Sequence, residues 1–317
     1  MTYRVRIIYN PTAGPWDMRR TLRRLMRYLE RRGWRTSMVE THHPGDAIRL
    51  AAEAAQEGLE AVLVAGGDGT INEAVNGLAG SETALGIIPV GTGNILARQL
   101  RMPLLSISAP FYVAEVGDAL LQSRLQRVDL GSANGRRFLC WAGLGLDAEI
   151  TAQMEPRPRY IKHLRTIPYI IAAFSVAAQF RGVRSHIRFD GRHELHTRVL
   201  MVLASNIQLY AAYFKIARNA AMDDGLLDVI IFKGLGLRYA LQHLPKLFFD
   251  RSFDNPHLIQ RQVRHLVVET DETASLQLDG DPYGEAPVEI AVRPAELLLL
   301  VPPSAPASLF TQPEVMR

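Results

Sequence analysis

Short apolar runs alternate with amphipathic segments through the first third of the chain. The runs have the length of buried strands, and the segments between them repeat hydrophobic residues with the period of a helix. Because a helical pattern follows each run, the order predicts a parallel sheet covered by helices. The expected strands are Val5–Tyr9, Thr36–Glu40, Ala61–Ala65 and Ala84–Pro89, and the expected helices are Trp16–Arg32, Asp46–Glu57, Thr70–Leu78 and Asn94–Leu100.

The pattern changes near residue 125, after which strand-like runs dominate and a helical insert, about Tyr160–Gln179, interrupts them. Runs of strands after an alternating region predict a separate β-rich domain. We therefore expect an α/β domain over residues 1–125, a β-sandwich domain over 126–301 whose last strand can return to the first, and a loose C-terminal tail over 302–317. The expected later strands are Arg137–Trp141, Thr197–Ala204, Leu227–Phe232, Val263–Glu269, Val288–Val292 and Leu297–Val301.

Composition adds the expectation of a cytoplasmic protein. Of the 317 residues, 48% are hydrophobic and 21% charged, which is ordinary for a chain with a real core. No cleavable leader is visible, and the longest apolar stretch, Ile167–Phe180, contains Pro168 and is shorter than the about 20 residues of a spanning helix. The lone Cys140 cannot form an internal disulfide, which fits a reducing compartment.

Glycine-bearing turns follow three of the expected strands: Asn10–Gly14, Gly66–Asn72 and Pro89–Asn94. Ligands of open α/β sheets bind at such carboxyl ends of strands. Glycine lets the backbone approach a ligand closely, and a helix N-terminus presents free amides that suit phosphate. No lysine precedes Lys162, so the chain has no Walker-type loop. Backbone amides and hydroxyls would have to hold a triphosphate here.

Asp68 stands at the bend of the central turn, where its charge would repel phosphate. A carboxylate makes sense there beside a magnesium ion or a hydroxyl that loses its proton. Taken alone, the motif is also compatible with a plain glycine turn and a capping aspartate. The later Asp224-Gly225 and Asp279-Gly280-Asp281 segments, taken alone, are ordinary turns as well. We expect Asp147 and Trp141 to be structural.

A series of motifs follows from residue 3 to 301: NPTAG at 10–14, GGDGTINEAVNGL at 66–78, PVGTGN at 89–94, GLGLDAEI at 143–150, MDDGLLDV at 222–229 and LDGD at 278–281. In order and spacing the chain resembles the diacylglycerol kinase catalytic family, which includes bacterial diacylglycerol kinases, YegS-like lipid kinases, sphingosine kinases and ceramide kinases. The resemblance implies an NAD kinase-like α/β domain and a C-terminal β-sandwich. It also implies ATP in the cleft between them and a lipid hydroxyl that enters from the membrane side.

The resemblance also implies roles for single residues. It places a magnesium ligand at Asp224 with the carbonyl of Leu226, while a further side-chain ligand of the family falls on Ala221, which offers only its carbonyl. Asp281 falls where many members carry a glutamate proposed as the general base, with Asp68 as its partner or its substitute. The implied nucleotide contacts are Asn10, Thr12, Thr41, Gly66, Gly67, Asp68, Gly69, Thr70, Ile71, Asn72, Gly91 and Thr92.

The sequence thus predicts a lipid kinase that uses ATP and Mg²⁺ to phosphorylate a hydroxyl of a diacylglycerol-like lipid. An NAD kinase-like enzyme is one alternative, and a non-catalytic, nucleotide-binding membrane-docking protein is another. The PVGTGN and LDGD motifs favour the lipid kinase, and the retained acids Asp68, Asp224 and Asp281 favour catalysis.

Basic segments suggest peripheral contact with an anionic membrane. The helix at 16–32 carries leucines on one face and arginines on the other, which fits either membrane attraction or a solvated face. The apolar insert Ile167–Phe180 and its basic flank, with Arg157, Arg159, Lys162 and Arg165, fit either membrane contact or a core helix. We expect no nucleic-acid partner. The pattern indicates neither an oligomeric state nor which lipid is used.

Overall fold

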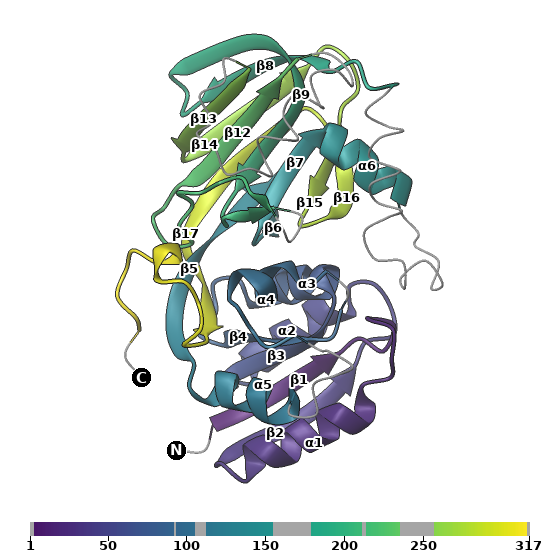
Figure 1. Ribbon diagram of the computed structural model, residues 1–317, viewed down its shortest axis with the longest axis vertical. Coiled ribbons are helices and arrows are strands. Elements are labelled where there is room, and N and C mark those ends of the chain that lie inside the picture. The colour runs from purple at the N-terminus through teal and green to yellow at the C-terminus, as the bar shows by residue number, and fades with distance from the viewer. Residues whose placement is uncertain are drawn as a thin grey trace. The chain divides into compact units, whose positions relative to one another are not determined.

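The chain folds into two compact units (Figure 1). Unit 1 comprises Met1–Leu130 and Pro294–Arg317, and unit 2 comprises Gly131–Arg293. The chain therefore enters unit 2 once and returns to unit 1 with its last strand. The computed structural model describes residues 3–91, 93–104, 112–154, 179–210, 214–234 and 257–315. Thr92 and most of the insert with its basic flank lie outside these ranges.

Unit 1 is built on a sheet of parallel strands. In space the order is β4-β3-β1-β2, and the C-terminal end of β17 pairs with β4 in parallel. Every residue of β3 and β4 is buried, as expected of central strands covered on both faces, whereas burial is only partial along most of the edge strand β2. The strands are β1 (Tyr3–Tyr9), β2 (Trp34–Glu40), β3 (Ala61–Gly66), β4 (Ala84–Pro89) and β17 (Val288–Val301). The predicted α/β architecture is confirmed.

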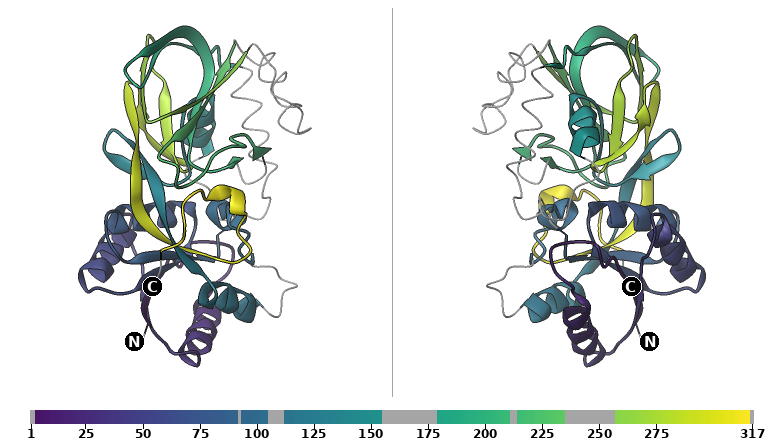
Figure 2. Two further views of the ribbon diagram at one scale, coloured as in Figure 1. Left: turned by 90° about the vertical axis from the view of Figure 1, so that its left-hand side faces the viewer. Right: turned by 90° about the vertical axis from the view of Figure 1, so that its right-hand side faces the viewer.

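Helices cover both faces of this sheet (Figures 1 and 2). Helix α1 packs with α5, and α2 packs with α3 on the other face. The connection from β1 to β2 runs one way along the sheet, and those from β2 through β3 to β4 run the other way, so right-handed crossovers place α1 opposite α2 and α3. The reversal lies between β1 and β3. The helices are α1 (Arg19–Glu30), α2 (Asp46–Gln56), α3 (Asp68–Leu78), α4 (Ile95–Gln99) and α5 (Tyr112–Leu121).

Unit 2 consists mainly of antiparallel strands around an apolar core. The strand order is β16-β15-β7-β9-β8-β14-β17, with β12 and β13 continuing from β9. Strand β8 buries every second residue, which is the pattern of a strand with one core face. The elements are β5 (Arg124–Ala133, shared with unit 1), β6 (Arg136–Phe138), β7 (Trp141–Gly145), α6 (Leu146–Met154), β8 (Val183–Phe189), β9 (His193–Ser205), β10 (Leu209–Tyr210), β11 (Phe214–Lys215), β12 (Leu227–Lys233), β13 (Leu258–Val263), β14 (His265–Thr270), β15 (Ser275–Leu278) and β16 (Asp281–Glu285).

Distant aspartates divide two runs that the sequence predicted as single strands. The run Arg137–Trp141 is interrupted because the backbone amides of residues 139–141 donate to the Asp279 carboxylate instead of to a neighbouring strand. The run Val263–Glu269 is interrupted because Asp190 Oδ1 accepts the amides of residues 264 and 265, at 2.9 and 2.8 Å. Such long-range acceptors leave no periodic trace in the sequence. Helices α5 and α6 and strands β5 and β8 were not predicted.

The last strand and the tail also differ from expectation. The two expected strands Val288–Val292 and Leu297–Val301 form one strand, β17, and the amide of Ala295 donates to Asp129 Oδ1 at 2.7 Å near its middle. The tail was predicted to be loose, which is wrong for its described part. The side chain of Leu309, in a short 3₁₀ turn, is fully buried, and Gln126 Nε2 donates to the Gln312 carbonyl at 3.1 Å. Among the described residues, no helix has the length and apolar character needed to cross a membrane.

Candidate active site

The turn after β1 is joined to the turn after β3 through Asn10. Its backbone amide donates to the Ala65 carbonyl at 3.0 Å, and its Nδ2 donates to Thr70 Oγ1 at 2.9 Å. Its Oδ1 accepts the Thr12 amide at 2.9 Å and the Thr12 hydroxyl at 2.8 Å. Both amide atoms of Asn10 are thus used to fix its neighbours. The structure brings Asn10, Thr12 and Thr70 together at the carboxyl edge of the sheet, on either side of the strand reversal, where open α/β folds bind ligands.

The second and third glycine turns lie against one another. A Cβ on Gly91 would stand 2.9 Å from Gly67 Cα and 3.2 Å from the Gly66 carbonyl oxygen. A Cβ on Gly14 would collide with the Val90 carbonyl oxygen, and Gly14 has a φ of +72°. These close backbone approaches explain Gly14 and Gly91 as packing requirements. All three glycine turns therefore converge in unit 1, as the sequence indicated.

Gly67 differs from its neighbours because the protein itself gives no reason for a glycine there. Its φ of −87° and ψ of 179° suit any residue, and nothing in the described part of the chain lies within 4 Å of the Cβ that it lacks. Gly66, in contrast, would place a Cβ 2.6 Å from Thr70 Cβ. Gly67 is also the N-cap residue immediately before α3, whose first amides have no acceptor within the helix. A ligand that approaches these amides closely would account for a glycine at this position.

Asp68 connects the second turn to the third. The carboxylate is half-buried, and its Oδ1 accepts the Ile95 amide at 2.8 Å where α4 begins. A Cβ on Gly93 would collide with the other oxygen, Oδ2. Asp68 therefore holds the Gly91–Asn94 segment beside α3, whatever further role its charge has. Arg98 supports the same segment, because its Nε donates to the Gly93 carbonyl at 3.0 Å.

Three other residues assigned to the nucleotide are buried. Thr41 is 8% exposed, and its amide donates to the Tyr9 carbonyl at 2.9 Å just beyond β2. Ile71 and Asn72 lie within α3 at 4% and 2% exposure, and the Ile71 amide donates to the Gly67 carbonyl. These residues support the turns from inside unit 1.

Glu73 had no role among the sequence-based predictions, and it caps the N-terminus of α2. Its carboxylate accepts the Gly45 amide at 2.9 Å and the Ala47 amide at 3.2 Å. Asp46 accepts the amides of His42 and His43, and these hydrogen bonds lower the pKa of its carboxyl to about 2. Protein carboxylates thus occupy the amides at the start of α2, whereas the N-cap residue of α3, Gly67, has no side chain with which to cap the helix. The only sequence signal for this role of Glu73 was an acidic residue a few positions after the second glycine turn.

Unit 2 carries the other predicted acids, in two Asp-Gly turns. In the first turn, Asp224 Oδ1 accepts the Leu226 amide at 3.0 Å, and Ala221 is buried. Burial, with a smaller contribution from the Asp224 charge, raises the pKa of the Asp228 carboxyl to about 6. Asp228 lies in β12, two residues beyond this turn, and carboxylate oxygens such as these are ligands that suit a hard divalent cation.

In the second turn the two aspartates have different surroundings. Asp279 is 5% exposed, and its carboxylate accepts the amides of residues 139, 140 and 141 at 2.8–2.9 Å. Asp281 begins β16 and is only half-buried. Of the two aspartates, Asp279 is therefore the one whose side chain is held by hydrogen bonds to the backbone. Asp147, expected to be structural, is buried with hydrogen bonds from Tyr210 and Gln277, and burial raises the pKa of its carboxyl.

Comparisons with known proteins match both halves of the chain. Residues 4–133 match the diacylglycerol kinase catalytic domain, and residues 141–301 match the YegS C-terminal NAD kinase beta sandwich-like domain. A diacylglycerol kinase from Bacillus subtilis (strain 168) is 30% identical over 288 residues, which cover 90% of this chain and 92% of that protein.

Solved structures share the fold. A crystal structure of a diacylglycerol kinase from Bacillus anthracis str. Sterne is 22% identical and superposes with a TM-score of 0.73 over 96% of this chain and 98% of that one. An NAD kinase from Archaeoglobus fulgidus, in complex with ATP, is 13% identical with a TM-score of 0.52, and each chain is covered to 95%. With both domains matched in order and a relative at 30% identity along nearly its whole length, the chain belongs to the diacylglycerol kinase family of lipid kinases.

Proposed function

We propose that this lipid kinase transfers the γ-phosphate of ATP to a hydroxyl of a diacylglycerol-like membrane lipid. The observation that carries the proposal is the open position at Gly67, at the N-terminus of α3 and beside the other two glycine turns. A phosphate group placed there would meet backbone amides without a side chain between them. Asn10, Thr12, Thr41, Gly66–Asn72 and Gly91 supply the surrounding turns, and Thr92 belongs to the same proposed set.

The sequence of unit 1 contains no lysine. We therefore propose that main-chain amides and hydroxyls bind the phosphates there. Thr12 and Thr70 carry hydroxyls at the carboxyl edge of the sheet, and both are already oriented by Asn10. Magnesium, when bound, neutralises charge on the phosphate oxygens, which a lysine does in Walker-type enzymes. Asp68 near the phosphate turns, and Asp224 with the Leu226 and Ala221 carbonyls in unit 2, are the oxygen ligands that we propose for divalent ions.

We assign the general base to Asp281, with Asp68 as the alternative. A lipid hydroxyl is a poor nucleophile, and a carboxylate within about 2.6–3.2 Å can take its proton as the bond to phosphorus forms. Asp281 suits this role because it is half-buried at the end of a turn, whereas Asp279 beside it is committed to three backbone amides. Asp68 already accepts the Ile95 amide through one oxygen.

Peripheral membrane contact is the proposed route to the lipid. Arg20, Arg23, Arg24 and Arg27 are exposed on α1, opposite the buried Leu22, Leu25 and Leu29. Each arginine near an anionic surface contributes about 1 kcal/mol, and the attraction is screened over about 8–10 Å at physiological salt. Sedimentation with vesicles that contain phosphatidylglycerol should therefore weaken with rising salt. Salt-independent sedimentation would contradict this route.

The decisive test is transfer of radiolabel from [γ-³²P]ATP in magnesium buffer to a panel of acceptors. The panel contains diacylglycerol, monoacylglycerol, ceramide, sphingosine, phosphatidylglycerol and NAD. We expect label on diacylglycerol or a close relative and none on NAD. Label on NAD alone would overturn the proposal in favour of the NAD kinase-like alternative. ATP binding with no label on any acceptor would favour the non-catalytic alternative.

A further inference from the structure

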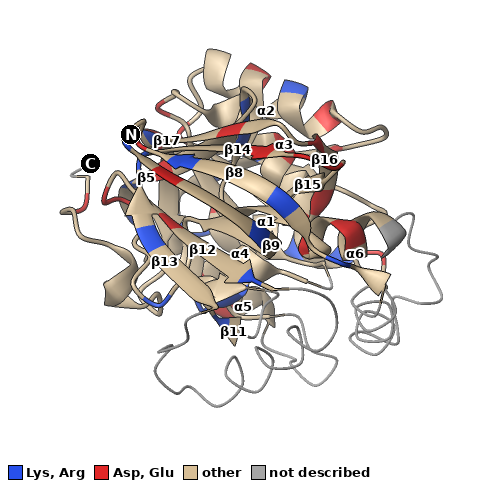
Figure 3. Cartoon of the chain, turned by 90° about the horizontal axis from the view of Figure 1, so that it is seen from above, with Lys and Arg blue, Asp and Glu red and all other residues tan. Residues whose placement is uncertain are grey.

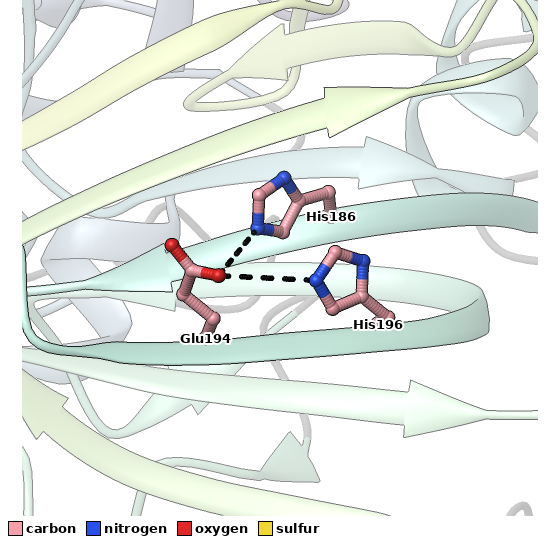
Figure 4. A group of neighbouring side chains, drawn as sticks. All are labelled: His186, Glu194 and His196. Carbon is pink, nitrogen blue, oxygen red and sulfur yellow. Dashed lines mark ion pairs between the residues drawn. The ribbon is translucent and has the colours of Figure 1, made fainter.

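A histidine–glutamate cluster lies on the β8–β9 hairpin of unit 2 (Figure 4). His186 on β8 pairs directly with His196 on β9, and Glu194 stands two residues before His196, so all three side chains project from the same face of the hairpin. This is the outer face, because the alternating residues Ile187 and Leu195 pack on the core. We refer to His186, Glu194 and His196 as the hairpin cluster.

The ligand atoms of the hairpin cluster converge on a small volume. Glu194 Oε2 lies 3.4 Å from His186 Nε2 and 3.9 Å from His196 Nε2, and all three atoms lie within 4.8 Å of one another. Two atoms bound to one tetrahedral zinc ion at about 2.0–2.2 Å are separated by about 3.3–3.6 Å. The first distance already has this value. The second needs only a small rotation of His196, whose side chain is 71% exposed.

Hydrogen bonding does not explain this convergence. His186 Nε2 is buried and has no hydrogen-bond partner among the described residues, although it faces the Glu194 carboxylate. The two imidazole rings are stacked, with centroids 4.0 Å apart and planes at 13°, an arrangement that would bring two like charges together if both rings were protonated. Imidazole nitrogens and a carboxylate are the donors that bind a borderline divalent metal ion.

A second carboxylate stands behind His186, on the side away from the cluster. Glu269 on β14 pairs with His186 in register, and its Oε2 lies 3.5 Å from His186 Nδ1. Arg188 holds that carboxylate, with Nη2 donating to Oε1 at 3.0 Å. A carboxylate facing the other ring nitrogen favours the tautomer whose Nε2 can bind a metal, and this arrangement is usual behind metal-bound histidines. The surrounding strands carry charges of both signs (Figure 3), so the cluster is not part of a one-sign surface.

We propose that the hairpin cluster is a Zn²⁺-class metal site, with His186 Nε2, His196 Nε2 and Glu194 Oε2 as ligands and a fourth position for water. The two nitrogen ligands select Zn²⁺ or a similar transition ion over Mg²⁺, which prefers oxygen. The bound ion links β8 to β9 on the outer face of unit 2 and stabilises the hairpin. This site is separate from the Asp224 turn, and the proposal does not depend on the lipid or nucleotide that the enzyme uses.

The test is a Zn²⁺ titration of the full-length protein after metal removal, against a competing chromophoric chelator and in excess Mg²⁺. We expect one tight Zn²⁺ per chain. Replacing Glu269 with Gln should weaken binding about 10–100-fold, the usual effect of a lost outer carboxylate. His186→Gln and His196→Gln should weaken it by more. The matched control is His193→Gln, on the same hairpin but at the alternate position, and it should bind like the wild type.

Amide hydrogen exchange shows where the ion binds, and it distinguishes loss of the site from misfolding of a variant. Zn²⁺ should slow exchange of the β8–β9 amides in the wild type and in His193→Gln, and should leave them unchanged in His196→Gln. Absence of a tight Zn²⁺, equal affinity in His196→Gln, or equal weakening in His193→Gln would each overturn the proposal. A melting temperature that responds to pH between 5 and 7 but not to Zn²⁺ would show a protonated histidine–glutamate pair instead.

Discussion

Asp-Gly turns occur in both units, but their glycines serve different needs. In unit 2, Gly225 and Gly280 have φ values of +72° and +91°, which a side chain would strain. In unit 1, Gly67 has an ordinary φ and open space around it. The unit 2 glycines are thus explained by conformation, whereas neither conformation nor packing against the described residues explains Gly67. A glycine that the fold does not require is a better marker of a ligand site than a glycine that it does require.

The aspartates of these turns also differ, in the backbone amides that they accept. Asp68, Asp224 and Asp279 each accept backbone amides, from the next turn, from their own turn and from a distant strand respectively. An acidic residue in a motif is therefore often part of the framework. Asp281 stands out because it follows such a turn while its neighbour Asp279 makes the anchoring bonds. The comparison separates residues whose loss should affect activity from those whose loss should affect folding.

The largest expected effect separates Gly67 from Gly280. Gly67→Val should abolish ATP binding and activity, because the side chain fills the space that we assign to phosphate, while the free energy of unfolding falls by at most about 1 kcal/mol from the poorer helix start. Gly280→Ala, the control, should lose about 1–2 kcal/mol of stability to its left-handed backbone and stay active. Calorimetry with ATP and denaturant unfolding measure both. Wild-type ATP affinity in folded Gly67→Val would remove the nucleotide from this turn.

The next effect concerns the general base. Asp281→Ala should lower kcat by about 10²–10⁴ with little change in ATP affinity, and Asp281→Glu should retain more activity than Asp281→Ala. Asp68→Asn is the fair comparison, because an amide oxygen can still accept the Ile95 amide while the charge is lost. If Asp281→Ala keeps near-normal kcat and Asp68→Asn is inactive, the base is Asp68.

Within the same turn, Asp279 should behave in the opposite way. Asp279→Ala leaves three backbone amides of residues 139–141 without their acceptor, which should cost about 3 kcal/mol or more of unfolding free energy. Asp281→Ala should lose less unfolding free energy, because Asp281 is half-buried whereas Asp279 is 5% exposed and holds three amides. Equal stability of the two variants in urea titrations would contradict the division of roles between these aspartates.

The smallest effect concerns the Asp224 turn and pH. The pKa of Asp228 is raised to about 6 in the folded protein, so its contribution to stability is present below the unfolded pKa of about 3.9 and is lost as pH rises through 6. Asp228→Asn should remove this loss and be more stable than the wild type near pH 7 by about 1 kcal/mol, allowing for partial exposure. Unfolding titrations from pH 4 to 7 without magnesium would show parallel curves if Asp228 has no such role.

Magnesium sharpens the same comparison. If the Asp224 turn holds Mg²⁺, the ion should raise the melting temperature mainly above pH 6, where the neighbouring Asp228 carboxyl is also charged. Asp224→Ala should erase that increase, and the control Asp279→Asn should retain it. An unchanged response to magnesium in Asp224→Ala would show that the turn is not a magnesium site.

Local pattern predicted much of unit 1 because its strands are continuous apolar runs and its turns carry glycine. Ala61–Ala65 and Ala84–Pro89 were placed to within a residue, and α2 differed only at its end. Unit 2 was harder to predict. Strand β8 carries arginines and a histidine between its buried residues, and the breaks at residues 139–140 and 264 are set by aspartates far away in the sequence.

By itself the sequence determined the α/β start, the β-rich remainder, the three glycine turns and the family resemblance, because these depend on local periodicity and short motifs. Only the tertiary structure distinguished Gly67 from Gly66 and Asp281 from Asp279, and only it brought His186 beside Glu194 and His196. These distinctions depend on which backbone amides and side chains become neighbours when distant segments pair. No local propensity encodes that outcome, because the pairing is decided by the packing of the whole unit.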